Sequence, residues 1–176
     1  MLLQLQETWV QLGKPVVVTA CTTCYQELKQ IEGMKRLTVW ECVDAYGLPD
    51  QAAPFARREP VAVHDPCTAR GEPQIYESVR RILEKMACPV EELAYVKEQT
   101  VCCGYGGLAL FGNSEVATAA IKNRVGQSPR DYLTYCWVCR DYLGKIGQKT
   151  TLHLLDLLFA QGQPAPYYDI SAKRFN

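Results

Sequence analysis

Short runs of β-branched, aromatic and other apolar residues recur along the chain, and each of them leads into a cysteine. The runs cover residues 16–20, 37–41, 61–66 and 131–135, and the cysteines that follow are Cys21, Cys42, Cys67 and Cys136. Runs of this kind predict strands, and the residues after each one are typical of a helix or a loop. Because alternating strands and helices indicate a parallel sheet, we expect an α/β fold with flanking helices. Ligands bind beyond the carboxyl ends of such strands, where these cysteines would lie.

Amphipathic periodicity predicts helices around these strands. The predicted helices cover residues 2–12, 72–88, 114–125 and 153–161. In the second helix, the apolar stripe consists of Ile75, Val79, Ile82, Leu83 and Met86. The third is predicted to be capped by Asn113 or Ser114, and the fourth to end before Gly162 and Pro164.

One part of the chain repeats further on. Residues 19–28, TACTTCYQEL, parallel residues 134–143, TYCWVCRDYL, because each combines a strand, a Cys-x-x-Cys spacing and a predicted helix. The segments 37–47 and 150–160 form a second parallel pair, with Asp44 opposite Asp156. This self-similarity predicts two copies of one module.

The two copies differ in extent. Residues 1–56 are predicted to hold a partial first module, made of a strand, a Cys-x-x-Cys, a helix and a strand, whereas residues 57–163 form a complete one. The Pro-containing segment 48–60 reads as a linker between them. The tail, residues 164–176, is expected to be irregular.

The composition excludes several classes of function. The chain has 176 residues, of which 48% are apolar and 22% charged, as in a soluble globular domain. Its net charge is zero, which argues against nucleic acid or an anionic membrane as a partner, because both need a basic surface. No apolar run is long enough to span a membrane, and the first residues lack the features of a signal peptide, so a cytoplasmic location is expected.

Nine cysteines are the main anomaly of the composition. In a reducing compartment they are expected to serve metal binding or redox chemistry rather than disulfides. Five of them form a pattern of one cysteine, an adjacent pair within VCCGYGG, and a Cys-x-x-Cys. This set is Cys67, Cys102, Cys103, Cys136 and Cys139.

Five thiolates exceed the four ligands of a zinc ion or of a cubane four-iron cluster. The pattern therefore predicts either an opened multi-iron cluster or a four-ligand site with one spare thiol, with zinc as the alternative metal. Two adjacent thiols suit a multi-iron cluster, because each thiol can bind a different iron. Gly104, Gly106 and Gly107 would let the backbone approach closely and donate N–H groups to sulfur.

This pattern resembles the CCG, or cysteine-rich, domain of the heterodisulfide reductases and of the iron–sulfur subunits of glycolate and lactate oxidation systems. The resemblance rests on HDPC at 64–67, CCGYGG at 102–107 and CWVC at 136–139, with ACTTC at 20–24 closing a preceding copy. It implies a Rossmann-like parallel sheet and a noncubane [4Fe-4S] cluster held by the same five cysteines. It also implies an electron-transfer subunit of an oxidoreductase, with flavin and ferredoxin-type iron–sulfur proteins as partners and a thiol or disulfide as substrate.

The first module departs from the family pattern, because it retains only Cys21 and Cys24. Two thiolates cannot complete a metal site, so this second half-site either holds no cluster or is completed by another chain. The disulfide chemistry of the reductases uses both clusters. Two other functions therefore stay open, namely a relay or docking module without disulfide chemistry and a zinc-stabilised interaction module.

Residues beside the five cysteines could assist the centre. Cys102, Cys103 and His64 are the candidate catalytic residues. His64 could carry protons to a leaving thiolate, although such a histidine more often holds its loop by hydrogen bonding. Arg70 and Arg140 each follow a cysteine of the set and could offset the charge of a cluster.

Four further residues are assigned roles from their position alone. Trp137 lies between two cysteines of the set and is expected to exclude water from it. Cys42 and Cys88 are expected to be buried thiols without a metal role, because free cysteine behaves as a small apolar residue. His153 stands at a predicted helix start and is expected to be structural.

Overall fold

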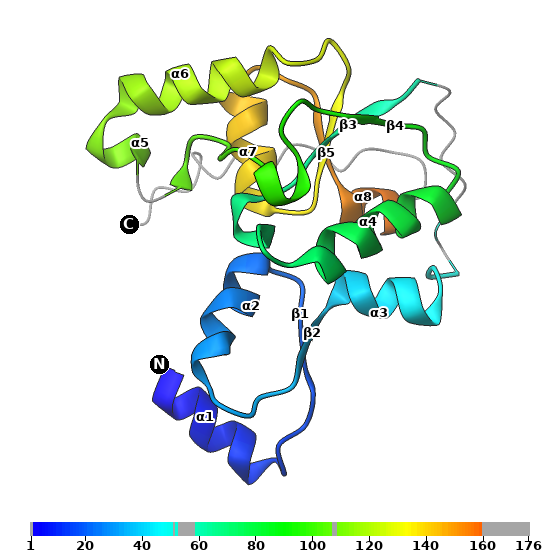
Figure 1. Ribbon diagram of the computed structural model, residues 1–176, viewed down its shortest axis with the longest axis vertical. Helices are drawn as coiled ribbons and strands as arrows, with labels where there is room; N and C mark the ends of the chain where they lie inside the picture. The colour runs from blue at the N-terminus through cyan, green and yellow to red at the C-terminus, as the bar shows by residue number, and fades with distance from the viewer. Residues whose placement is uncertain (1, 51, 53–58, 107–108, 160–176) are drawn as a thin grey trace, which may run out of the picture.

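A computed structural model describes residues 2–50, 52, 59–106 and 109–159, and within them the chain forms an α/β fold with two parallel sheets (Figure 1). The larger sheet has the strand order β4-β3-β5-β6, and the smaller one pairs β1 with β2. The strands are β1 Val17–Thr19, β2 Arg36–Thr38, β3 Val61–His64, β4 Val90–Glu92, β5 Tyr132–Thr134 and β6 Thr151–His153. The predicted parallel arrangement is confirmed, but it is divided between two sheets.

The helices connect and flank these strands. The α-helices are α1 Leu2–Gln11, α2 Thr22–Glu27, α3 Val39–Tyr46, α4 Pro73–Lys85, α5 Ala109–Gly112, α6 Ser114–Val125, α7 Trp137–Lys145 and α8 Leu154–Phe159. Three short 3-10 helices are η1 Leu28–Gln30, η2 Cys67–Ala69 and η3 Lys97–Gln99. All four helices predicted from periodicity are present.

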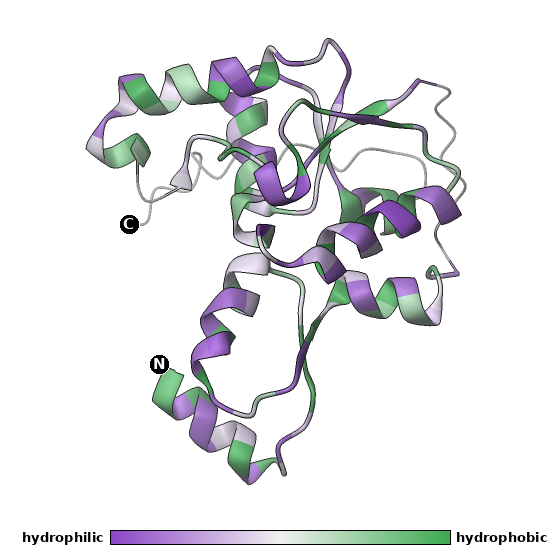
Figure 2. Ribbon diagram, viewed as in Figure 1, coloured by the Kyte–Doolittle hydropathy of each residue, from purple (hydrophilic) through white to green (hydrophobic). Residues whose placement is uncertain are grey.

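Local sequence explains where the two longest helices begin. Pro73 occupies the first turn of α4, where its missing N–H costs no hydrogen bond. Asn113 caps α6, since its side-chain oxygen accepts a hydrogen bond from Val116 N at 3.1 Å. The predicted stripe of α4 is buried, and Figure 2 shows that hydrophilic residues occupy the rest of this helix.

The first module shares its core with the second. Trp40 of α3 is fully buried, and its ring lies 6.0 Å from that of Tyr135 and 6.1 Å from that of His153. Helix α3 also lies beside α4 (Figure 1). A separate small cluster of Trp9, Leu28, Ile31 and Met34 packs α1 and η1 together. The first module is therefore anchored to the second through α3.

The run at 37–41 is a strand only up to Thr38. There the chain turns into α3, because the Thr38 side chain caps Glu41 N while Glu41 accepts from Thr38 N at 2.7 Å. This capping box starts the helix within the predicted strand. Cys42 consequently lies in α3 and not at the end of a strand, which corrects the expectation.

The repeat extends through both modules at a constant offset. The same number of residues separates Cys21 from Cys136, Cys24 from Cys139 and Thr38 from His153. At this offset the counterpart of Asp156 is Glu41. The two residues also make the same contact, since each carboxylate accepts a hydrogen bond from the backbone N–H at the end of the preceding strand. The predicted pairing of Asp156 with Asp44 is therefore wrong by one turn of helix.

Several predicted segments lie outside the described residues. They include most of the linker 48–60, residue Gly107, and the tail 164–176. Among the residues described, no helix has the length and apolar character required to cross a membrane.

Candidate metal centre

The five cysteines of the set come from three connections at the carboxyl ends of the strands. Cys67 begins η2 shortly after β3, and Cys102 and Cys103 lie in the loop after η3. Cys136 follows β5 at the start of α7, and Cys139 lies in the first turn of that helix. Cys103 and Cys139 are buried, whereas the other three are half-buried.

The five sulfur atoms contact one another in a continuous chain. Cys67 contacts Cys102, and the adjacent Cys103 contacts both Cys102 and Cys139 through hydrogen bonds. Cys139 in turn contacts Cys136. The two neighbouring thiols thus reach different parts of one site, and the structure brings all five predicted residues together.

The glycines of the CCGYGG loop leave room for sulfur. The amides of Gly104 and Gly106 donate to Cys102 Sγ at 3.4 Å and 3.3 Å. A Cβ atom at Gly106 would lie 2.7 Å from Cys102 Sγ and 3.9 Å from Cys67 Sγ. Gly104 has a φ of 97°, and a Cβ there would lie 2.5 Å from the Ile121 side chain. Any larger residue at either position would displace the loop.

Hydrogen bonds make the five thiols unequal. Hydrogen bonds from Cys103, Cys67 and the two glycine amides hold the pKa of Cys102 far below its usual range, although burial raises it. The hydrogen bond with Cys139 lowers the pKa of Cys136 to about 7. The hydrogen bond to Cys102 raises the pKa of Cys103 to about 11, and it also raises that of Cys67. Cys102 and Cys136 are therefore the sulfurs predisposed to be thiolates, the form that binds metal.

Asp65 joins the three cysteine-bearing connections. Its buried carboxylate accepts two hydrogen bonds from Arg80, at 2.7 Å and 2.8 Å, one from Tyr135 Oη at 2.9 Å, and one from Lys97 N at 2.8 Å. Thr100 Oγ1 donates to its carbonyl oxygen at 2.7 Å. The loop of Cys67, the loop of Cys102 and the strand before Cys136 are thus held in place by one residue.

Sequence reasoning did not single out Asp65, which it treated only as part of HDPC. A second connection between the same loops runs from Arg70, whose Nη2 donates to Thr100 O at 2.5 Å. Arg70 therefore ties loops together at the centre's edge. Arg140, the other predicted counter-charge, pairs with Asp156 at 3.2 Å and lies over the Trp137 ring.

His64 is fully buried beside the sulfurs. Arg124 Nε donates to its Nδ1 at 2.8 Å, and burial lowers the pKa of His64 to about 3. The ring is therefore neutral near pH 7 and has no imidazolium proton to give, which argues against the proton-carrying role. Arg124 was missed from the sequence, although it falls on the buried stripe of α6 with Ala117 and Ile121, where a charged residue is unusual.

Cys21 and Cys24 are exposed, unlike the five cysteines of the set. They flank the start of α2, and a hydrogen bond with Cys21 raises the pKa of Cys24. Thr22 and Thr68 share a 2.5 Å hydrogen bond, so α2 packs against the turn that follows Cys67. A cavity of about 440 Å³ is lined both by residues 20–23, which include Cys21, and by residues around Cys136.

Three other predicted assignments concern residues outside the centre, namely two cysteines and one histidine. Cys88 is buried in the main core, and burial raises its pKa to about 11. Cys42 is only half-buried on α3, so the expectation of a buried thiol is less well met there. His153 accepts a hydrogen bond from Leu155 N at 3.2 Å, at the start of α8, as a structural residue would.

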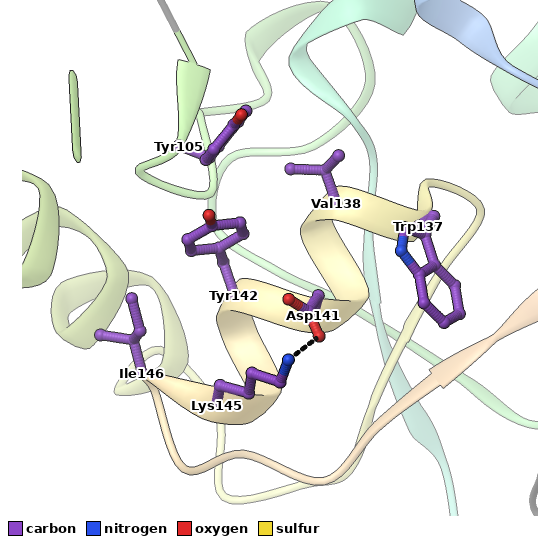
Figure 3. A pocket seen from close by; sticks show the side chains of 7 residues that line it. All are labelled: Tyr105, Trp137, Val138, Asp141, Tyr142, Lys145 and Ile146. Carbon is purple, nitrogen blue, oxygen red and sulfur yellow. Dashed lines mark ion pairs between the residues drawn. The ribbon is translucent and has the colours of Figure 1, made fainter. Parts of the chain in front are cut away.

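Aromatic residues form a second hollow on the outer side of α7. Figure 3 shows Tyr105 facing Tyr142 across it, with Trp137 at one end and an Asp141–Lys145 ion pair along the helix. The two tyrosine rings lie 4.6 Å apart, and the hollow measures about 380 Å³. Trp137 is 43% exposed and lines both hollows, so it covers the centre only in part.

The donor set fits an iron–sulfur cluster. Five soft sulfur donors, two amides aimed at one of them and the space that Gly106 leaves beside Cys102 and Cys67 suit iron–sulfur ligation. A nitrogen of His64 lies within 4.8 Å of the sulfurs of Cys103 and Cys139. It is not a ligand as it stands, because a histidine that accepts from arginine at Nδ1 carries its proton on Nε2.

Comparison with known proteins identifies the domain. Residues 61–134 match the family described as CCG, cysteine-rich domain, a match that includes Cys67, Cys102 and Cys103 and ends just before Cys136. An uncharacterised iron–sulfur protein of Methanocaldococcus jannaschii is 30% identical over 121 residues, which are 67% of this chain and 23% of that protein. The chain thus spans about a quarter of the length of this relative. With the family match and the geometry of its cysteines in agreement, the segment 61–134 belongs to the CCG family of cysteine-rich domains.

Proposed function

We propose that this chain is an iron–sulfur electron-transfer subunit of a heterodisulfide-reductase-like oxidoreductase. In this proposal Cys67, Cys102, Cys103, Cys136 and Cys139 hold a noncubane [4Fe-4S] cluster, which supplies one-electron chemistry when bound. The observation that carries the proposal is the unbroken chain of five contacting sulfurs. The family match and the relative described as an iron–sulfur protein support it.

A thiol or disulfide is the substrate that the cavity between the modules favours. A module that only passed electrons would bury its centre under protein, whereas this cavity opens beside Cys136 and is large enough for a small organic thiol. Arg140, Thr23 and Asp156 are among the residues that line it and give it polar character. We assign disulfide reduction to this place, next to the half-site of Cys21 and Cys24.

The partners follow from the same proposal. Flavin and ferredoxin-type iron–sulfur subunits would exchange electrons with the centre. Another segment or chain would supply the ligands that Cys21 and Cys24 need for a second site, because two thiolates fill only part of it. The two cysteines occupy the positions that Cys136 and Cys139 occupy in the other module.

Metal analysis of the anaerobically purified chain tests this function. We expect about four irons with matching acid-labile sulfide per chain, and an electron paramagnetic resonance signal in at least one oxidation state. One zinc without sulfide would instead support the interaction module and refute the proposal.

Serine substitutions test the ligand assignment. We expect Cys102→Ser and Cys103→Ser to lose or convert the cluster, because each removes a sulfur from the contact chain. The matched control is Cys88→Ser, which changes a buried thiol in the main core and should leave the visible spectrum and the iron content unaltered. If the Cys88 variant bleached as fully as the Cys103 variant, the assignment would be wrong.

A further inference from the structure

Two buried polar residues beside the metal centre lack partners that their chemistry requires. His64 Nε2 and Arg124 Nη2 are both buried without a hydrogen-bond partner, while the two residues are themselves joined at 2.8 Å. Buried polar atoms are nearly always paired, so each such exception in a folded protein calls for a physical reason. Both residues have no exposed surface, so bulk water does not supply that partner.

The hydrogen bond between them fixes the tautomer of His64. A guanidinium N–H can only donate, so Nδ1 must accept, and the proton of the neutral ring must lie on Nε2. The unpaired group is therefore a buried N–H donor. The sulfurs of Cys103 and Cys139 lie within 4.8 Å of one of the ring nitrogens, and sulfur can accept a hydrogen bond.

The guanidinium of Arg124 also lacks a directly paired carboxylate among the described residues, and the charge of Asp65 acts on it only without a direct ion pair. Its Nη1 donates to the neutral Gln127 side chain at 2.7 Å, and its carbonyl oxygen accepts from Tyr132 Oη at 2.7 Å. In the part of the chain that the structure describes, no carboxylate forms an ion pair with it. A buried cation is costly unless an anion lies nearby, and a group of thiolates is such an anion.

We infer that Arg124 and His64 form a pair that tunes the metal centre: Arg124 orients the His64 N–H toward sulfur and offsets the negative charge of the five thiolates. The inference rests on the proposed iron–sulfur function and adds residues that bind no metal themselves. Both effects favour the reduced, more negative state of a cluster. Hydrogen bonds to sulfur and nearby positive charge raise the reduction potential for this reason.

Four variants of the full chain separate this role from a structural one. Arg124→Lys keeps the charge, Arg124→Gln removes it, and His64→Gln replaces the ring N–H with an amide. Tyr132→Phe is the control, because it removes a buried hydrogen bond to Arg124 without altering charge or any donor to sulfur. Each protein is loaded with iron and sulfide under anaerobic conditions, and its iron content and midpoint potential are measured.

We expect the midpoint potential to shift downward in Arg124→Gln and to stay near that of the wild type in Arg124→Lys and Tyr132→Phe. Histidine labelled with ¹⁵N should show hyperfine coupling to the cluster in the wild type, and the coupling should be lost in His64→Gln. Equal potentials in all loaded proteins, or absence of the coupling in the wild type, would overturn the inference.

Nuclear magnetic resonance of the metal-free chain tests the inference even if a variant does not take up iron and sulfide. The ¹⁵N shifts of His64 should report the Nε2–H tautomer in the wild type and in Tyr132→Phe. An Nδ1–H tautomer would refute the inference even if iron binds. A wild-type protein that binds no iron would refute the proposed function and with it the tuning role, whatever the tautomer.

Discussion

At the scale of single residues, Asp65 is the side chain on which the geometry of the centre depends. It receives hydrogen bonds from Arg80 of α4, from Tyr135 directly after β5 and from Lys97 of η3, and so fixes the three connections that carry the cysteines. None of these bonds involves a metal ligand. The loops that carry the sulfurs are therefore anchored by hydrogen bonds between protein groups.

Substitution of Asp65 should destabilise the fold strongly. We expect Asp65→Asn to lower the free energy of unfolding by about 3 kcal/mol, because Arg80 loses its buried partner. Glu77→Gln is the control, since Glu77 pairs with Lys97 near the surface and should cost less than about 1 kcal/mol. Urea unfolding of the metal-free proteins, followed by circular dichroism, measures both. Equal losses in the two variants would contradict this role for Asp65.

The functional residues that share a characteristic sequence spacing could be predicted from the sequence. Those whose role depends on burial and on distant partners could not. The five cysteines were identified because adjacent and Cys-x-x-Cys spacings are visible in the chain. The roles of Asp65 and Arg124 depend on partners that lie far away in sequence, such as Tyr135 and His64. The charge of Arg124 on an apolar stripe was the signal that could have revealed it.

At the scale of elements, the CCGYGG loop owes its shape to the absence of side chains. Two of its amides donate to one sulfur, and Gly106 leaves space that a methyl group would fill. The loop is thus the element that is most sensitive to small substitutions.

Addition of one methyl group to this loop should impair metal binding more than stability. We expect Gly106→Ala to reduce the iron content at least several-fold after reconstitution, because its Cβ would lie 2.7 Å from Cys102 Sγ. Gly112→Ala is the control, since a Cβ there meets nothing within 4 Å. Iron content and thermal unfolding are measured together. Full iron content in the Gly106 variant would show that the loop has room to spare.

Helices were predicted correctly where the capping residue and the apolar periodicity indicate the same helix. Helix α6 begins at the predicted cap Asn113, and α4 buries the predicted stripe. The error at residues 37–41 arose because β-branched composition indicated a strand, whereas the Thr38–Glu41 capping box ended it. Hydrogen bonds at helix starts, rather than composition, decided that boundary.

At the scale of the whole molecule, acid should destabilise the protein through its two buried histidines, His64 and His153, of which His153 packs against Trp40 of α3. Burial lowers the pKa of His153 from 6.5 to about 4, so the folded protein keeps this ring neutral while the unfolded chain protonates it. The unfolded state then binds more protons below pH 6.5. Stability from this group is complete above pH 6.5 and is lost as the pH falls toward 4, by about 1.4 kcal/mol per pH unit.

Replacement of His153 measures this contribution. We expect His153→Gln to show a shallower decline in unfolding free energy than the wild type between pH 6 and pH 4, with parallel curves above pH 7. Equilibrium denaturation of the metal-free proteins across this range supplies the data. Curves of equal slope throughout would mean that His153 is protonated as readily in the folded protein as in the unfolded chain.

The division into two sheets could not be read from the chain. The repeat was visible in ACTTC and CWVC, but it gives no information on whether β1 and β2 extend the larger sheet or form their own. Packing decides this arrangement, since Trp40 inserts beside Tyr135 and His153 and so fixes α3 against the second module.

The Asp65 hydrogen bonds have a consequence for the protein after its metal centre is damaged. A centre held by cysteine thiolates can lose its metal when the thiolates are oxidised. Here the anchoring bonds of the three loops run between protein groups alone, so the loops would keep their positions when the metal is lost. Repair in the cell would then require only fresh iron and sulfide delivered to reduced thiols, and no new synthesis of the chain.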